Sequence, residues 1–406
     1  MRFVFFGLSI ASAWGSGHAT TYRGLIRELH RRGHHSTFYE RRTEWYDNNC
    51  DLPQADYCDI RRYRSWPPPD AGEAVAAADV VVLGSFAGAG YGDGVAIAEW
   101  LPRSTKALLV YYDIDTPRTL AAFRENGRTH YLLRSQLAYF DLVLSFAGGP
   151  VLDELRRWGA RRVEPFYCAI DPELHRPAAP VAEYRCDLGY MGTYDATRQD
   201  VVEELFLAPA RLCPQRRFVL AGAEYPAEVL SRLPPNVARY VHVNPQEHAA
   251  FHASCAWEVK ATRGPMRRLG WAPSVTLFEA AACGVPLISD RWPGFEQFFS
   301  PGEEALLADT RDDVLAAMEA GEAERQRIGE AGRRRVLASH TYVQRVDQLE
   351  ALLAGLGAGA GSARQRGTSP ARAAGDGSGR PEGGATVQGR GAPLTVSPRS
   401  RVGASG

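Results

Sequence analysis

The sequence predicts an α/β protein built from two doubly wound domains, followed by a disordered C-terminal tail. Short apolar segments without polar alternation take turns with helix-like segments, which is the pattern of parallel strands buried on both faces. This alternation occurs in two series, and a proline-rich stretch joins them. The chain has 406 residues, which suits two domains of about 100–200 residues each.

The first series starts at the N-terminus. Its apolar runs are short and end at polar residues or glycine, so we expect strands. The segment 21–32 has apolar residues on one face and is followed by Gly33, a common helix stop. The expected strands are 2–6, 37–39 at least, 79–83, 107–112, 141–146 and 162–166, and the expected helices include 21–32 and 151–158.

The second series repeats the same alternation. The segment 167–184 between the two series contains Pro172, Pro177 and Pro180 and is expected to be the joint. The expected strands are 187–191, 218–221, 237–243, 256–259 and 285–289, and the expected helices are 198–207, 246–254, 274–283, 310–339 and 342–353.

These patterns divide the chain into successive parts, which are an N-terminal domain 1–170, a linker 171–184, a C-terminal domain 185–339, a helix 340–354 and a tail 355–406. The tail contains 14 of the 40 glycines and no aromatic residue, so it cannot bury enough apolar surface to offset chain entropy. Ligands bind such sheets at the carboxyl ends of the strands. Two domains facing each other would therefore place the site in the cleft between them.

Composition excludes several classes of protein. The 47 basic and 47 acidic residues give a net charge of zero, which argues against a nucleic-acid partner. The seven cysteines are scattered singly, which argues against a disulfide framework or zinc site and favours the cytoplasm. The first ten residues mimic a signal peptide but lack a clear basic start. No apolar run approaches the ~18–20 residues of a membrane span, although peripheral membrane contact is left open.

The loop 7–18 follows the first strand and is rich in small residues, including Gly15 and Gly17. It leads to a helix that Thr20 or Thr21 is expected to cap, and the free N–H groups there favour an anion. The spacing matches neither the dinucleotide-binding GxGxxG motif nor a P-loop, which weakens both readings. His18 is a candidate base, a candidate hydrogen-bond donor to a phosphate, or only a neighbour of the helix cap.

Two aspartates follow the strand 107–112. Asp113 and Asp115 would face the same side only if the strand continued, and Thr116 and Pro117 end it. We therefore expect no metal at this position. Asp115 is expected to shape the loop into the cleft or to contact the acceptor.

The segment 260–304 carries the strongest group of polar residues. Arg263 follows a strand, and Ser274 is expected to cap a helix whose N-terminus suits a diphosphate. Glu279 lies within an apolar run, which predicts burial near the cleft. Glu279 and Glu296, the latter just after Gly294, are candidates to accept hydrogen bonds from sugar or ribose hydroxyls.

This segment, PSVTLFEAAACGVPLISDRWPGFEQFFSPGEEALL, resembles the donor site of GT-B glycosyltransferases, and more closely that of the spore-maturation (CgeB-type) family. The opening FFGLS and WGSGHATTYRGLIRELHRRGHH is similar to the glycine-rich acceptor-side opening of these enzymes. CAIDPE, at 168–173, resembles their interdomain linker. HTY, at 340–342, starts a segment resembling the helix that crosses back to the N-terminal domain.

The resemblance implies roles for individual residues. Glu279 matches the second glutamate of an E-x7-E pattern, which binds the donor ribose in relatives, but Trp271 stands where the first would be. Gly192 and Thr193 lie in the segment that resembles the phosphate loop, and Arg198 lies where relatives place a basic residue on the diphosphate. In inverting relatives a side chain of the N-terminal domain acts as base, for which His18 or Asp115 is available; retaining relatives need none.

The resemblance thus implies a glycosyltransferase that moves a sugar from a nucleotide donor without a metal cofactor. The acceptor, whether glycan, lipid or small molecule, is left open. A nucleotide-sugar epimerase, a non-catalytic nucleotide- or sugar-binding protein with a degenerate site at Trp271, and a nicotinamide oxidoreductase are the alternatives.

Overall fold

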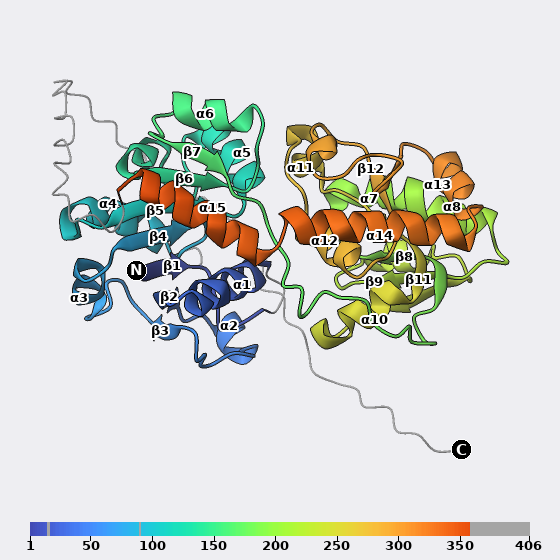
Figure 1. Cartoon of the computed structure of the whole chain (residues 1–406), viewed down its shortest axis with the longest axis horizontal. Helices are drawn as coiled ribbons and strands as arrows, with labels where there is room; N and C mark the ends of the chain where they lie inside the picture. Colours follow the sequence, from blue (N-terminus) through green and yellow to red (C-terminus); the bar gives the residue numbers. More distant parts are fainter. Residues whose placement is uncertain (14–16, 89–90, 358–406) are drawn as a thin grey trace, which may run out of the picture. The chain divides into compact units, whose positions relative to one another are not determined.

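The computed structural model describes residues 1–13, 17–88 and 91–357, and within them the chain forms two parallel sheets (Figure 1). The first has the strand order β3-β2-β1-β4-β5-β6-β7. Its strands are β1 (Arg2–Gly7), β2 (His35–Arg41), β3 (Asp59–Tyr63), β4 (Val80–Gly84), β5 (Leu108–Asp113), β6 (Leu142–Ser145) and β7 (Val163–Pro165). Its helices are α1 (Gly17–Arg31), α2 (Glu44–Asn48), α3 (Ala71–Ala76), α4 (Asp93–Ser104), α5 (Thr116–Asn126) and α6 (Val151–Arg157), with a 3₁₀ turn η1 (Arg134–Tyr139).

The second sheet has the strand order β10-β9-β8-β11-β12-β13. Its strands are β8 (Cys186–Met191), β9 (Phe218–Ala221), β10 (Val237–Tyr240), β11 (Cys255–Lys260), β12 (Leu287–Asp290) and β13 (Leu306–Ala308). Its helical segments are η2 (Ala196–Arg198), α7 (Gln199–Val202), the π-helical η3 (Glu203–Leu207), α8 (Ala208–Leu212), α9 (Ala227–Leu230), η4 (Pro245–Glu247), α10 (His248–Ala253), α11 (Gly264–Leu269), α12 (Val275–Ala282), η5 (Phe295–Gln297), α13 (Arg311–Met318) and α14 (Glu322–Ser339). The last helix of the described residues, α15 (Tyr342–Gly355), follows α14.

Burial on both faces explains why the strands lack polar alternation. In β1, Phe3 and Phe5 belong to one core cluster, and Val4 and Phe6 belong to a second one on the opposite face. Successive side chains of a strand point to opposite faces, so a strand covered on both sides must be apolar throughout. The predicted fold class, α/β with two doubly wound parallel sheets, is confirmed.

Several predicted elements differ in detail. The helix expected at 21–32 begins at Gly17, because the Thr21 hydroxyl donates to the Gly17 carbonyl at 2.9 Å and so lies inside the helix. Thr20 and Thr21 are therefore not caps. The helix expected at 310–339 is two helices, α13 and α14. The segment 198–207 is not one α-helix but passes through 3₁₀, α and π turns.

Two segments connect the sheets. One is the chain between β7 and β8, and the other is the chain that follows α14. Residues 166–185 contain neither a helix nor a strand, apart from a bridge of Ile170 to Thr341. The following α15 packs on α1, where the Tyr342 ring occupies the space beside Gly24 and its hydroxyl donates to the Thr20 carbonyl at 3.2 Å. The predicted domain limits remain predictions. Of the predicted tail 355–406, Gly355 belongs to α15, and residues 358–406 lie outside the described residues.

The strand orders locate the functional edge of each sheet. The order reverses between β1 and β4 in the first sheet and between β8 and β11 in the second. In open parallel sheets, ligands bind outside the carboxyl ends of the strands at such a reversal.

In addition, none of the helices in the described ranges has the length and hydrophobicity that a membrane span requires.

Candidate functional site

At the reversal point of the first sheet, His18 meets Asp115. His18 lies in the first turn of α1, just after the β1 loop, and Asp115 precedes α5. The Nε2 of His18 lies 3.2 Å from the Oδ2 of Asp115. Burial would raise the pKa of Asp115, but the hydrogen bond to His18 and the charges of His18, Arg118 and Arg263 outweigh burial and lower it. Asp115 is therefore a carboxylate at neutral pH.

Asp113 has a different environment from Asp115. It is fully buried at the end of β5, and its Oδ1 accepts a hydrogen bond from the Thr119 hydroxyl at 2.8 Å. Burial raises the pKa of Asp113 to about 7. Across the described part of the chain, no three His, Cys, Asp or Glu side chains gather as a metal site would require.

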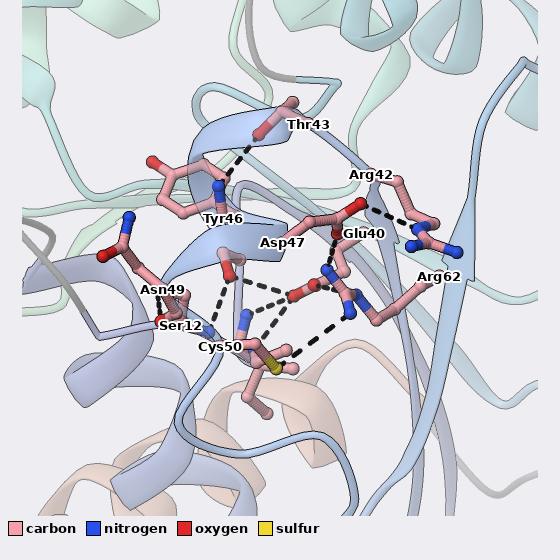
Figure 2. A network of polar contacts seen from close by, with 12 residues as sticks. Ser12, Glu40, Arg42, Thr43, Tyr46, Asp47, Asn49, Cys50 and Arg62 are labelled. Carbon is pink, nitrogen blue, oxygen red and sulfur yellow. Dashed lines mark hydrogen bonds and ion pairs between the residues drawn. The ribbon is translucent and has the colours of Figure 1, made fainter.

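A buried carboxylate holds the start of the loop after β1. Glu40, at the end of β2, accepts hydrogen bonds from the Ser9 hydroxyl at 3.0 Å and from the N–H groups of Ile10 at 2.7 Å and Ala11 at 3.0 Å. The Nε of Arg62 on β3 donates to the same carboxylate at 2.9 Å. Figure 2 shows this network together with the neighbouring ion pairs of α2. Gly17 begins α1, whereas Gly15 lies outside the described residues.

We expect Glu40→Gln to lower the free energy of unfolding by about 3 kcal/mol, because it removes the charge that accepts all four hydrogen bonds and leaves Arg62 without its buried partner. Denaturant melts of the purified variant measure this change. The matched control is Asp47→Asn, since Asp47 contacts Arg62 and Arg42 from the more exposed side of the same network. Equal losses in the two variants would contradict the central role of Glu40.

The second sheet has a small cavity at its own reversal point. The residues around it come from the ends of β8, β11 and β12, from η2 and from the start of α12. They are Tyr190, Met191, Arg198, Lys260, Ala261, Thr262, Ser274, Thr276, Leu277, Ser289 and Trp292. The structure thus brings together two of the predicted donor-site residues, Arg198 and Ser274, and adds Lys260.

Lys260 is a buried cation at the end of β11. Its ammonium donates to Glu258 Oε1, while Glu258 Oε2 lies 2.7 Å from the Nδ1 of His252. Burial would raise the pKa of Glu258, but the charges and hydrogen bonds of His252 and Lys260 lower it to about 2. An ammonium has three donors, and the hydrogen bonds among described residues use one of them. Lys260 can therefore still bind an anion in the cavity.

The other two predicted phosphate ligands differ in position, because Arg198 lines the cavity and Arg263 does not. Arg198 donates to the carbonyl of Thr193, and a Cβ at Gly192 would lie 3.0 Å from the Arg198 guanidinium. Arg263 is half-exposed and is paired with Asp195 at 3.2 Å, outside the cavity lining. The absence of a side chain at Gly192 leaves Arg198 room to reach the cavity.

Ser274 occupies the N-cap position of α12, but its side chain makes no capping hydrogen bond. The expectation that it caps the helix is wrong, because its hydroxyl instead bonds the Thr276 hydroxyl at 3.0 Å. The first N–H groups of a helix lack partners within the helix. The start of α12, which borders the cavity, therefore carries partial positive charge that favours an anion.

Glu279 is buried as predicted but faces the linker and not the cavity. Its Oε1 lies 3.4 Å from the Nε2 of His175. Burial would raise the pKa of Glu279, yet the hydrogen bond and charge of His175, with the charges of His248 and His252, lower it to about 2. Conversely, burial would lower the pKa of His175, but Glu279 and Asp171 raise it. The pair ties α12 to residues 171–184.

We expect the stabilisation from this pair to decrease at both acidic and basic pH. The pKa of Glu279 falls below its ordinary 4.5, so its contribution is complete above that pH and is lost as the pH falls toward about 2. The pKa of His175 is raised above 6.5, so its contribution is complete below 6.5 and is lost as the pH rises through the folded value. Glu279→Gln should therefore lower Tm most at about pH 5.5, where both groups of the pair are charged. The loss of Tm should be smaller at about pH 3 and at about pH 9. The control Glu296→Gln, at an exposed position, should leave Tm unchanged; a uniform Tm loss in Glu279→Gln would contradict the assignment.

Trp271 stands in a strained position away from the cavity lining. Its φ of 47° lies in the left-handed region, which is costly for a bulky residue. Two backbone hydrogen bonds hold it, from its N–H to the Pro293 carbonyl at 2.7 Å and from the Gly148 N–H to its carbonyl at 2.9 Å. A Cβ at Gly149 or at Gly294 would lie within 2.4 Å of the indole. Trp271 is thus a packing residue, and Gly294 serves that packing, while Glu296 is exposed.

Comparisons with known proteins bear on the fold and on the sequence of residues 198–351. Residues 198–351 match the protein family described as glycosyl transferase-like. Among solved structures, a sucrose-phosphate synthase from Thermosynechococcus elongatus is 16% identical with a TM-score of 0.65, and the match covers 88% of this chain and all of that one. Anabaena HepE (Alr3699) in complex with UDP-glucose is 14% identical with a TM-score of 0.62, covering 87% of this chain and all of that one.

An alpha-glucosyltransferase in complex with UDP-glucose and DNA containing an abasic site is 13% identical with a TM-score of 0.64, covering 87% of this chain and 99% of that one. No curated protein matches the chain. At these identities the structural similarity establishes the fold, which is GT-B, as the sequence resemblance predicted. Residues 198–351, which contain the cavity residues Arg198, Lys260 and Ser274, are glycosyl transferase-like in sequence.

Proposed function

We propose that this protein is a glycosyltransferase that takes a sugar from a nucleoside-diphosphate donor. The observation that carries the proposal is the cavity at the β8–β11 reversal, where Lys260, Arg198 and the N-terminus of α12 converge. These groups suit a diphosphate, whose negative charge increases when it leaves the sugar. Cations and helix N–H groups that are fixed in place stabilise that charge without a metal ion, so we also propose that no metal is required.

The family match over residues 198–351 supports a transferase over the alternatives. Structures with this fold include complexes with UDP and UDP-glucose. UDP-glucose is therefore the first donor to test, and glucose is the expected sugar class. On the sequence of 273–307 we propose membership in the spore-maturation (CgeB-type) group. The epimerase and the nicotinamide oxidoreductase have no comparable support.

In an inverting transfer, the acceptor hydroxyl needs a group that removes its proton. We propose that His18 takes this proton, with Asp115 orienting the imidazole and stabilising its charged form. The acceptor oxygen then bonds to the anomeric carbon as the bond from that carbon to the diphosphate oxygen breaks. The products are the glycosylated acceptor, the nucleoside diphosphate and the protonated histidine, which returns its proton to water.

The experiment is an assay of UDP release from UDP-glucose by the full chain, with and without EDTA, beside a titration of UDP itself. UDP binding with slow UDP release to water, unaffected by EDTA, supports a metal-independent transferase. UDP binding without release overturns catalysis and indicates a nucleotide-binding protein. Conversion of UDP-glucose to another UDP-hexose indicates an epimerase, and the absence of any UDP binding overturns the donor-site assignment.

A further inference from the structure

Phe86 stands in a strained position beside the His18–Asp115 pair. It follows β4, at the reversal point of the first sheet, and its φ of 61° is in the left-handed region. Strain of this kind in a bulky residue persists only where the surroundings fix it, and it is concentrated at functional sites. The Phe86 ring lies edge-on to His18 at 5.7 Å between centroids.

Neighbouring residues hold the Phe86 ring. The Tyr131 ring packs on it at 4.6 Å, and the Tyr131 hydroxyl lies 2.6 Å from the Thr119 hydroxyl on α5. The His130 ring lies edge-on at 5.0 Å. The half-buried Phe86 ring is therefore a fixed apolar surface next to the candidate base.

Arg118 places a cation over this surface. It lies in the first turn of α5, and its guanidinium carbon is 5.3 Å from the centroid of Phe86. Its side chain is exposed, and within the described ranges its guanidinium forms neither a hydrogen bond nor an ion pair. The five guanidinium N–H donors therefore remain available to a ligand.

Among the described residues, no carboxylate forms an ion pair with Arg118. Asp115 is bonded to His18, and its distance from the guanidinium exceeds the 4.0 Å of an ion pair. Burial and the charge of Arg118 both lower the pKa of His130, so this ring is neutral at neutral pH and the positive charge beside Phe86 is that of Arg118. A guanidinium stacked on an aromatic ring is held in one orientation, which suits bidentate binding of phosphate or carboxylate.

We propose that Arg118 and Phe86 form the acceptor site and select an acceptor that carries a phosphate or carboxylate group near the hydroxyl that receives the sugar. The proposal rests on the proposed function, since it assigns the substrate class of that reaction. Arg118 binds the anion, Phe86 holds the Arg118 guanidinium in place, and the acceptor hydroxyl is directed to His18. The donor cations Lys260 and Arg198 belong to the other sheet, so the two anionic groups are bound separately.

The test measures the binding of glucose 6-phosphate, glucuronate and glucose to the full chain by calorimetry, in the wild type, Arg118→Ala and Arg118→Lys. We expect at least one anionic sugar to bind about 10- to 100-fold more tightly than glucose. Arg118→Ala should abolish this preference and Arg118→Lys should keep part of it. Preference for glucose 6-phosphate alone identifies a phosphate, and equal preference for glucuronate identifies a general anion site.

The matched control is Arg124→Ala, because Arg124 lies on the same helix and is paired with Glu154 at the surface. It should keep the preference of the wild type. The proposal is overturned if glucose binds as tightly as both anions, if no anionic sugar binds, or if Arg118→Ala keeps the preference. UDP is titrated into each variant: Arg118→Ala should bind UDP as the wild type does, and a loss there would assign Arg118 to the donor. Failure of UDP to bind the wild type would overturn the donor site alone.

Discussion

Replacement of Lys260 by methionine is expected to reduce UDP release from UDP-glucose by about 100- to 1,000-fold. Lys260 is the buried cation of the cavity, and the loss of one fixed donor to a developing negative charge costs about this factor. UDP affinity should fall as well, because the same ammonium binds the diphosphate of the product. Initial rates and UDP titrations measure the two effects separately.

A loss of stability is the main complication, because Lys260→Met leaves the buried Glu258 carboxylate with His252 alone. Breaking a buried ion pair typically costs about 3–5 kcal/mol. The double variant Glu258→Gln/Lys260→Met removes both charges and should recover most of the Tm without recovering UDP binding. Lys106→Met is the matched control, since Lys106 is the only other lysine and is exposed on the first sheet. Normal UDP affinity in the folded double variant would remove Lys260 from the site.

The sequence predicted most of the fold because the central strands are apolar throughout. The two strands that were missed, β3 and β13, are the edge strands of their sheets. The first has the sequence Asp-Ile-Arg-Arg-Tyr, and the second has three residues. An edge strand is paired on one side only and tolerates charge, so its pattern resembles that of a loop.

The candidate site was predicted less completely. Arg198 and Ser274 line the cavity, because Arg198 ends η2 directly before α7 and Ser274 stands at the N-terminus of α12. Lys260 was available from the sequence as one of only two lysines, placed at the end of an apolar strand, and it was not assigned a role. Glu279 was predicted to be buried, but its partner His175 lies 104 positions earlier in the chain. Local periodicity gives no information on a pairing that depends on where the linker passes.

The second large effect is expected at His18. Its replacement by alanine should lower kcat for transfer by about 100- to 10,000-fold, which is the usual contribution of a general base. UDP affinity should stay within twofold of the wild type, because His18 lies on the first sheet and the diphosphate cavity on the second. Asp115→Asn should lower kcat less, because the imidazole remains but loses the carboxylate that orients it.

The matched control is His30→Ala, because His30 lies exposed in the last turn of the same helix, and it should keep the wild-type kcat. The anomeric configuration of the product, read by NMR, gives an independent check. Inversion requires a base opposite the leaving diphosphate and should accompany the His18 effect. Retention of configuration, together with a His18→Ala variant that keeps more than a tenth of kcat, would exclude His18 as the base. The His18–Asp115 pair would then serve only to position the acceptor.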